Sequence, residues 1–177
     1  DVVAPVIARL AQVTLHTTGA EVTVEAIRAG ALSAITEVTG ESSGGSSLNG
    51  SGTSMALGGA VTLNAIRGAA DARVESVDID TDSAAFSVRA ENRLSLVADL
   101  RNGLTTGSQG GAALVAYNTL GHGAPNLLTA LSDLLGLVPT DAADFSARAE
   151  VVDSIVSAAS VTVRAISAAQ LSASIAA

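Results

Sequence analysis

An internal repeat constrains the fold of this chain more than any other feature, because a recurring segment usually marks a recurring structural unit. An Ala-Arg segment is followed each time by two stretches that are rich in Val. Arg9 and Arg73 lie 64 positions apart, and Arg73 and Arg148 lie 75 positions apart. The same two offsets separate the later stretches, which begin at Val22, Phe86 and Val161. The sequence therefore predicts three equivalent structural segments.

Apolar and polar residues alternate within these segments. Val22, Val24 and Ala26 alternate with Thr and Glu, and the end of the chain alternates in the same way. A period of two is typical of β-strands that have one buried and one solvated face. A Gly-Gly strand at 58–65 that is matched at 110–118 adds a further repeated β element. Because Gly, Ser, Asp and Asn turns separate short strands, we expect an all-β chain rather than alternating strands and helices.

The composition favours a parallel β-solenoid (β-helix) among the all-β architectures. Hydrophobic residues make up 48% of the chain, but aromatic residues only 2%. A two-sheet sandwich and a transmembrane barrel remain alternatives, although both draw on aromatic side chains. Thin rows of Ala, Val, Leu and Ile suit coils that stack about 4.8 Å apart. We expect coils of about 20 to 25 residues, so that each 64-residue repeat holds about three coils and the chain about eight.

Two segments depart from the repeat within what we expect to be a single domain over residues 1–177. Residues 40–54 are rich in Gly and Ser and predict a flexible excursion from the solenoid. Residues 121–144 carry leucines at helical spacing between Pro125 and Pro139. This second segment predicts a short amphipathic helical insertion on the flank of the solenoid, and it would account for the longer second offset.

The charge of the chain argues against nucleic acid as a partner, because the formal net charge is −8. The absence of Cys excludes disulfides and thiolate metal sites. No apolar run is long enough to span a bilayer as a helix. The first residues, Asp1–Val3, show no signal-peptide pattern, so we expect a chain that was processed or excised from a longer one.

The sharpest polar cluster consists of Asp78, Asp80 and Asp82, whose carboxylates occupy alternate positions and would share one strand face. Ca²⁺ prefers several carboxylate and carbonyl oxygens, so these residues form a weak calcium candidate. An EF-hand loop would need Gly and Glu where Ser83 and Arg89 stand. The favoured interpretation is therefore a solvated strand face beside a turn, and we expect no cofactor.

His16 and His122 are the only histidines, which is too few for a three-histidine metal site. We expect both on the surface and predict no catalytic residue. Parallel β-helices can nevertheless host polysaccharide-cleaving sites, which cluster acids and sugar-stacking aromatic residues on one face. A carbohydrate-active enzyme or a polysaccharide-binding module is therefore the alternative function, although aromatic residues are scarce here.

Three stretches resemble the repeats of very large secreted bacterial filamentous adhesins, including the leukotoxin-type group. These stretches are Gly59–Ile66, Ala72–Ile79 and Ala20–Ala26. The resemblance covers most of the chain outside 40–54 and the expected helical insertion. It implies a secreted or surface-bound β-solenoid that is exported by a two-partner or autotransporter route, with no cofactor and no conserved catalytic residue.

These features predict a structural or adhesive extracellular solenoid, a stalk or filament segment, rather than an enzyme. The last residues, Leu171–Ala177, still alternate and carry no capping feature. An uncapped end exposes unpaired backbone groups, so we expect further repeats or a second subunit to stack on it. The expected partners are thus copies or repeats of the chain itself, together with a host or cell-surface receptor or polysaccharide.

Overall fold

The structure, a computed structural model, describes residues 2–42, 55–106, 109–121 and 145–176, and these residues form an all-β protein. The chain passes three times through the same set of sheets, and each pass is called a circuit below. The first circuit contains β1 (Val2–Val3), β2 (Val6–Ala11), β3 (Thr14–His16) and β4 (Val22–Ser42). The second contains β5 (Met55–Arg67), β6 (Ala70–Glu75), β7 (Asp78–Asp80) and β8 (Ala85–Thr106). The third contains β9 (Gln109–Leu120), β10 (Ala147–Val152), β11 (Ile155–Ser157) and β12 (Ser160–Ala176).

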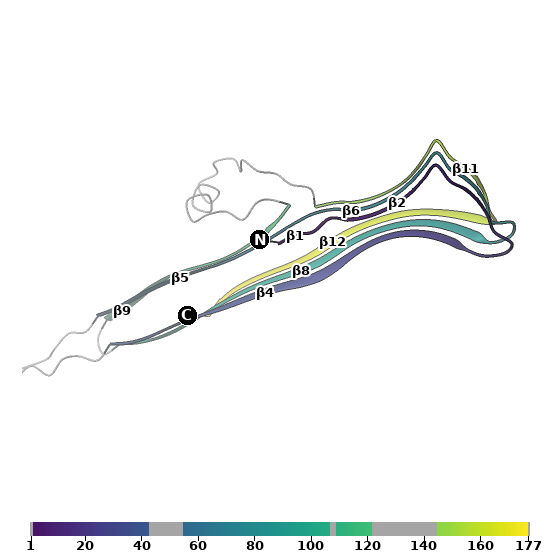
Figure 1. Ribbon diagram of the computed structural model, residues 1–177. Coiled ribbons are helices and arrows are strands. Elements are labelled where there is room, and N and C mark those ends of the chain that lie inside the picture. The colour runs from purple at the N-terminus through teal and green to yellow at the C-terminus, as the bar shows by residue number, and fades with distance from the viewer. Residues whose placement is uncertain (1, 43–54, 107–108, 122–144, 177) are drawn as a thin grey trace, which may run out of the picture.

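Equivalent strands of the three circuits pair in parallel. Four three-stranded sheets result, with the orders β1-β5-β9, β2-β6-β10, β3-β7-β11 and β4-β8-β12. The second circuit is therefore central in every sheet. Figure 1 shows the chain running out along the first three sheets, turning near β11 and returning along β4, β8 and β12. Each circuit is a long, narrow loop, and the three loops lie one on another.

The strand register confirms the 64-residue repeat across the first two circuits, where Arg9 pairs with Arg73 and Val22 with Phe86. Phe86 also pairs with Val161, at the predicted offset of 75. The expected match between Arg73 and Arg148 is wrong by two residues, because Arg73 pairs with Glu150. The turn before β12 is two residues shorter than the turn before β8. The sequence offset between paired residues of the second and third circuits therefore falls from 77 in β7 and β11 to 75 in β8 and β12.

One circuit occupies the whole 64-residue repeat, so the predicted coils of about 20 to 25 residues are wrong. The cause is the length of the return strands, since β4 has 21 residues and β8 has 22. At about 3.3 Å per residue, a strand of this length spans about 70 Å. The described residues therefore build three large circuits rather than about eight small ones.

Both departures from the repeat fall largely outside the described residues. No helix occurs in the described part of the chain, so the helical insertion predicted over 121–144 is not seen. Gly121 forms a bend after β9, and residues 122–144 are outside the described residues. The excursion predicted at 40–54 is wrong for residues 40–42, because these residues still belong to β4 and pair with 104–106. Residues 43–54 are outside the described residues as well.

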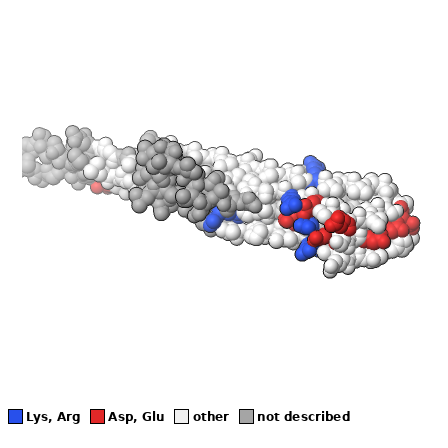
Figure 2. Space-filling model, turned by 90° about the horizontal axis from the view of Figure 1, so that it is seen from above, with Lys and Arg blue, Asp and Glu red and all other residues white. Residues whose placement is uncertain are grey.

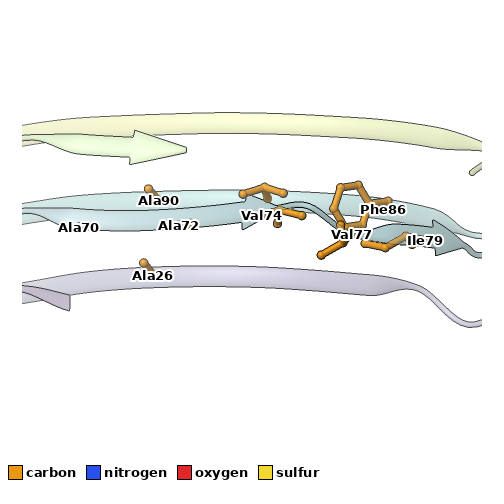
Figure 3. Close-up of a cluster of buried hydrophobic side chains, with 9 residues drawn as sticks. Ala26, Ala70, Ala72, Val74, Val77, Ile79, Phe86 and Ala90 are labelled. Carbon is orange, nitrogen blue, oxygen red and sulfur yellow. The ribbon is translucent and has the colours of Figure 1, made fainter. Parts of the chain in front are cut away.

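A thin aliphatic core lies between the outgoing and returning strands of the second circuit. Alternate side chains of β8 point inward, and Phe86, Val88 and Leu96 have no exposed surface. Phe86 and Val88 face the inward side chains of β6, which include the fully buried Ala72 and Val74, whereas Leu96 clusters with Ile66 of β5. Figure 3 shows Phe86 beside Val77 and Ile79, followed by Val74, with Ala72, Ala70 and Ala90 further along. Small residues allow the two layers to approach closely, which explains how the chain builds a core with so few aromatic residues.

A left-handed corner recurs at the same place in every circuit. Gln12, Ser76 and Asp153 follow β2, β6 and β10, and their φ angles are 54°, 52° and 49°. A non-glycine residue in this region costs about 1 to 2 kcal/mol. The backbone N–H of Gln12 donates to the carbonyl of Glu75, and that of Ser76 donates to the carbonyl of Val152. The hydrogen-bond ladder thus continues through the corner and offsets part of its conformational cost.

Candidate functional site

The three aspartates of the calcium candidate do not share one strand face. Asp78 and Asp80 are the first and last residues of β7, whereas Asp82 lies in the following turn with a φ of 57°. The backbone N–H of Asp82 donates to Oδ1 of Asp80 at 3.0 Å. Oδ2 of Asp80 lies 3.3 Å from Nδ1 of His16, which is its register partner in β3. The carboxylate of Asp80 is therefore engaged by its neighbours.

Within the described ranges, no group of three His, Asp or Glu side chains lies together in a way that could hold a metal ion. The calcium candidate stays a weak prediction. His16 is exposed at the surface, and His122 lies outside the described residues. The described residues contain no helix that is long and apolar enough to cross a membrane.

Ion pairs connect the circuits on the outer face of β2, β6 and β10. Glu75 of the second circuit lies 2.7 Å from Arg9 of the first and 3.1 Å from Arg73. Arg73 also lies 3.1 Å from Glu150 of the third circuit, which Arg148 approaches at 2.5 Å. The hydrogen bond from Arg9 and the nearby charge of Arg73 hold the pKa of Glu75 below its usual value. These pairs align the three circuits at their outer surface.

A second charged cluster lies on the outer face of β4, β8 and β12. Glu91 contacts Arg89 and lies 3.2 Å from Arg93, and only 5% of its side chain is exposed. The hydrogen bond from Arg89 lowers the pKa of Glu91, and the charges of Arg93 and Arg164 act in the same direction. Arg89 also lies 3.6 Å from Glu25 of the first circuit. Glu91 is thus an ionised, paired carboxylate at the centre of this cluster.

Asparagines form a ladder inside the stack, which the sequence interpretation missed. Asn64 of β5 and Asn118 of β9 are register partners, and Nδ2 of Asn64 donates to Oδ1 of Asn118 at 3.0 Å. Nδ2 of Asn64 also donates to the carbonyl of Val97, and Nδ2 of Asn118 to the carbonyl of Ser172. Val97 and Ser172 are themselves register partners. Each asparagine therefore joins an outgoing strand to the returning strand of its own circuit.

A buried arginine and a further asparagine hold the bend between β5 and β6. Arg28 is 6% exposed and donates to Oδ1 of Asn92 at 3.2 Å and to the carbonyl of Arg67 at 3.0 Å. Asn92 in turn donates to the carbonyls of Gly68 and Ser146. Burial lowers the pKa of Arg28, although its guanidinium stays protonated at neutral pH. The asparagine ladder and the contacts of Arg28 with Asn92 share one sequence signal, which is a polar residue at an inward position of an alternating strand.

A surface hollow of about 420 Å³ lies at the left-handed corner, and Arg9, Ala11, Gln12, Glu75 and Ser76 line it. Its two charged residues pair with each other. The hollow therefore presents a neutralised ion pair rather than a free charge that would attract an ionic ligand.

The inward side chains of β12 differ sharply in exposure from their partners in β8. Phe86, Val88, Leu96 and Leu100 of β8 are completely buried. Their register partners in β12 are Val161, Val163, Leu171 and Ile175, which are 53%, 48%, 50% and 50% exposed. We call these four residues the open row. The open row faces the inside of a circuit, and no further circuit covers it within the described part of the chain.

Charges are unevenly distributed along the long axis of each circuit. Figure 2 shows Arg, Asp and Glu gathered toward the end at which β3, β7 and β11 lie. The sequence agrees, because β9 has no charged residue and β5 only Arg67. The outer face of β5 and β9 is instead apolar, with Leu57, Val61 and Val115 exposed.

A search with the whole chain found no matching family model, no matching curated protein and no matching solved structure. The resemblance to filamentous adhesins therefore stays a prediction.

Proposed function

We propose that this chain is a segment of a parallel β-solenoid that serves as an extracellular stalk or adhesion surface. Three circuits pair in parallel with nearly constant register, and thin aliphatic rows fill the space between outgoing and returning strands. Repetitive architectures of this kind add length by adding equivalent units, each of which contacts only its neighbours. An acidic surface, with a net charge of −8, would keep such an array soluble.

The open row carries this proposal. Complete burial of a Val, Leu or Ile side chain is worth about 1.5 to 3 kcal/mol, so covering the exposed half of four such residues would stabilise the end by about 4 kcal/mol. Val161, Val163, Leu171 and Ile175 are inward residues of a circuit. A further circuit on top of β12 would bury them as the second circuit's residues are buried. This arrangement suits one unit of a longer stack.

The outer face of β5 and β9 supports an adhesive role. Leu57, Val61 and Val115 are exposed there in a region without charged residues on β9. Val61 and Val115 are direct register partners, so their side chains lie side by side on the sheet. Contiguous exposed apolar surface commonly marks a site of contact with another molecule. We therefore place the adhesive contact on this face.

The acids of the outer faces do not favour the alternative of a polysaccharide-cleaving enzyme. A glycosidase needs one carboxyl group with a raised pKa to act as a general acid. Glu75, Glu91 and Asp99 have lowered pKa values instead, mainly because arginine or serine side chains donate hydrogen bonds to them. Glu75 and Asp99 connect β6 to β2 and β8 to β12, and Glu91 pairs with arginines of its own strand, so all three carboxylates have structural roles.

An attachment assay tests the adhesive role. Beads that carry the chain should remain on cell-coated or polysaccharide-coated surfaces under flow better than uncoated beads do. The variant Val61→Lys/Val115→Lys should reduce attachment at least fivefold, because two charges would enter the apolar face. Ile7→Lys is the control, since Ile7 is also outward and even more exposed than Val61 and Val115 but lies on β2. Attachment equal to that of bare beads, or release of reducing sugar ends from the polysaccharide, would refute the proposal.

A further inference from the structure

We infer that a second copy of this chain docks on the open row with its first circuit, continuing all the major sheets in parallel register. This inference rests on the proposed solenoid architecture and specifies its partner, orientation and register. The surface to be covered is the free edge of β10, β11 and β12, and the surface that covers it is the free edge of β2, β3 and β4. Both edges belong to outer strands of their sheets.

The inward side chains of the two edges match in kind. Because both edges pair with the same middle circuit, the register places each residue of β12 opposite one residue of β4 of the next copy. Leu171 then meets Leu32, each of which pairs with Leu96 within a single copy. Further inward pairs in this register are Val161 with Val22, Val163 with Val24, Ala165 with Ala26 and Ala173 with Ala34, and Ile175 meets the smaller, polar Thr36. Three of the four residues of the open row would thus be covered by a residue of their own kind.

The outward charges of the two edges are complementary. Arg164 of one copy meets Glu25 of the next, because both pair with Arg89 inside a copy. Glu150 meets Arg9 in the same way, because both pair with Arg73. No like charges oppose each other among the described strand residues of the two edges, since Arg148 meets Ile7 and Glu37 meets Ala176. Such charge pairs contribute little energy when they are exposed, but they favour one register over its neighbours.

The interior polar positions are also compatible. Arg28 of the second copy would lie opposite Ser167, whose hydroxyl can accept a hydrogen bond from the guanidinium. Gly30 would lie opposite Ala169, so that no large side chain opposes another at this point. Docking of one end on the opposite end is a heterologous contact, and repetition of it produces an open filament rather than a closed dimer.

Cysteine cross-linking tests the register, because the chain contains no native Cys. Ser33 and Ser172 are both exposed and both pair with Val97, so they would be adjacent across the interface. Within one copy they are two strand spacings apart, about 9.6 Å, which exceeds the reach of a disulfide of about 7 Å. A mixture of Ser33→Cys and Ser172→Cys chains should therefore give a disulfide-linked dimer under mild oxidation. The doubly substituted chain should give a ladder of oligomers.

A displaced pair supplies the matched control. Gln170 lies two residues from Ser172 on the same exposed face of β12. A mixture of Ser33→Cys and Gln170→Cys chains should cross-link at least tenfold more slowly. Equal rates for the two mixtures would overturn the proposed register. Prevalent linkage of Ser33→Cys chains to one another would overturn the head-to-tail orientation.

A mixing experiment tests the orientation without cross-linking. Leu171→Lys places a charge in the open row, and Leu32→Lys places one in the edge that covers it. Each variant alone should sediment as a monomer at concentrations at which the unmodified chain forms oligomers. An equimolar mixture should form a one-to-one dimer, since one intact copy of each edge remains. Absence of that dimer would overturn the inference.

The two proposals fail in different ways. An unmodified chain that stays monomeric and does not cross-link in register, but still attaches beads to surfaces, would refute stacking and leave the proposed function intact. Oligomers that cross-link in register but attach to no surface would refute the adhesive function and leave the stacking inference intact.

Discussion

Two leucines at one ladder position allow the contribution of stacking to stability to be measured. Leu96 and Leu171 are register partners and belong to the same inward row, but Leu96 is completely buried and Leu171 is 50% exposed. Leu96→Ala removes a buried side chain and leaves an enclosed cavity, which costs about 2 to 5 kcal/mol. Leu171→Ala loses about half of the transfer free energy and leaves no enclosed cavity, so we expect a cost of about 1 kcal/mol.

Urea denaturation followed by far-ultraviolet circular dichroism measures both costs, at a concentration low enough to keep the chain monomeric. With an m-value of about 2 kcal/mol/M, Leu96→Ala should lower the urea midpoint by about 1.5 M, and Leu171→Ala by about 0.5 M. At high concentration the cost of Leu171→Ala should rise toward that of Leu96→Ala, because a docked copy would bury the leucine. Equal costs for the two variants at low concentration would refute the reasoning from exposure.

Three further predictions concern the interior polar groups, one bend and the carboxylates. Asn64→Leu should lower the free energy of unfolding by about 1 to 3 kcal/mol in urea titrations, because it leaves buried acceptors without their donor. Gly68→Ala should be clearly more destabilising than Gly19→Ala: both glycines have positive φ, but a Cβ at Gly68 would lie 2.9 Å from the carbonyl oxygen of Ala4, whereas Gly19 has open space. Comparable thermal midpoints for these two variants would contradict that account. Because the pKa values of Glu75 and Glu91 are lowered from 4.5, their contribution to stability is fully present above that pH and is lost as the pH falls through the lowered values. Thermal midpoints measured from pH 7 to 3 should show this loss, and Glu91→Gln should flatten the profile.

The sequence repeat predicted the register where two circuits have equal length. Val22, Phe86 and Val161 are indeed stacked partners, because alternation and a constant offset both point to that pairing. The predicted register was wrong at Arg148. The sequence aligned the Ala-Arg segments at Arg73 and Arg148, but in the structure they are shifted by two residues relative to each other. A shift of two keeps every side chain on its face, so the hydrophobic pattern alone cannot detect it.

The size of the circuit could not be predicted from common coil lengths. No Pro and no cluster of turn residues interrupts the chain from Val22 to Val38, which is compatible with one long strand rather than part of a small coil. The interior asparagines were missed for a related reason. The Gly-Gly segments were matched at 58 and 110, whereas the structure aligns Asn64 with Asn118 because their amides bond to each other. Such pairing depends on a partner 54 positions away, which no local pattern contains.

The spacing of the ladders has a consequence for biogenesis. Every strand partner of the first circuit lies 64 positions further along the chain, so residues 2–42 contain no sheet hydrogen bond among themselves. Closing so large a loop has an entropic cost, which is incurred before the hydrogen bonds and contacts between the paired strands can offset it. Folding rates therefore fall as the paired residues become more distant in sequence. A nascent chain therefore emerges largely unpaired until its second circuit is made. A preformed edge that receives each new circuit would remove this delay, since the first added strand would find its hydrogen-bonding partner at once.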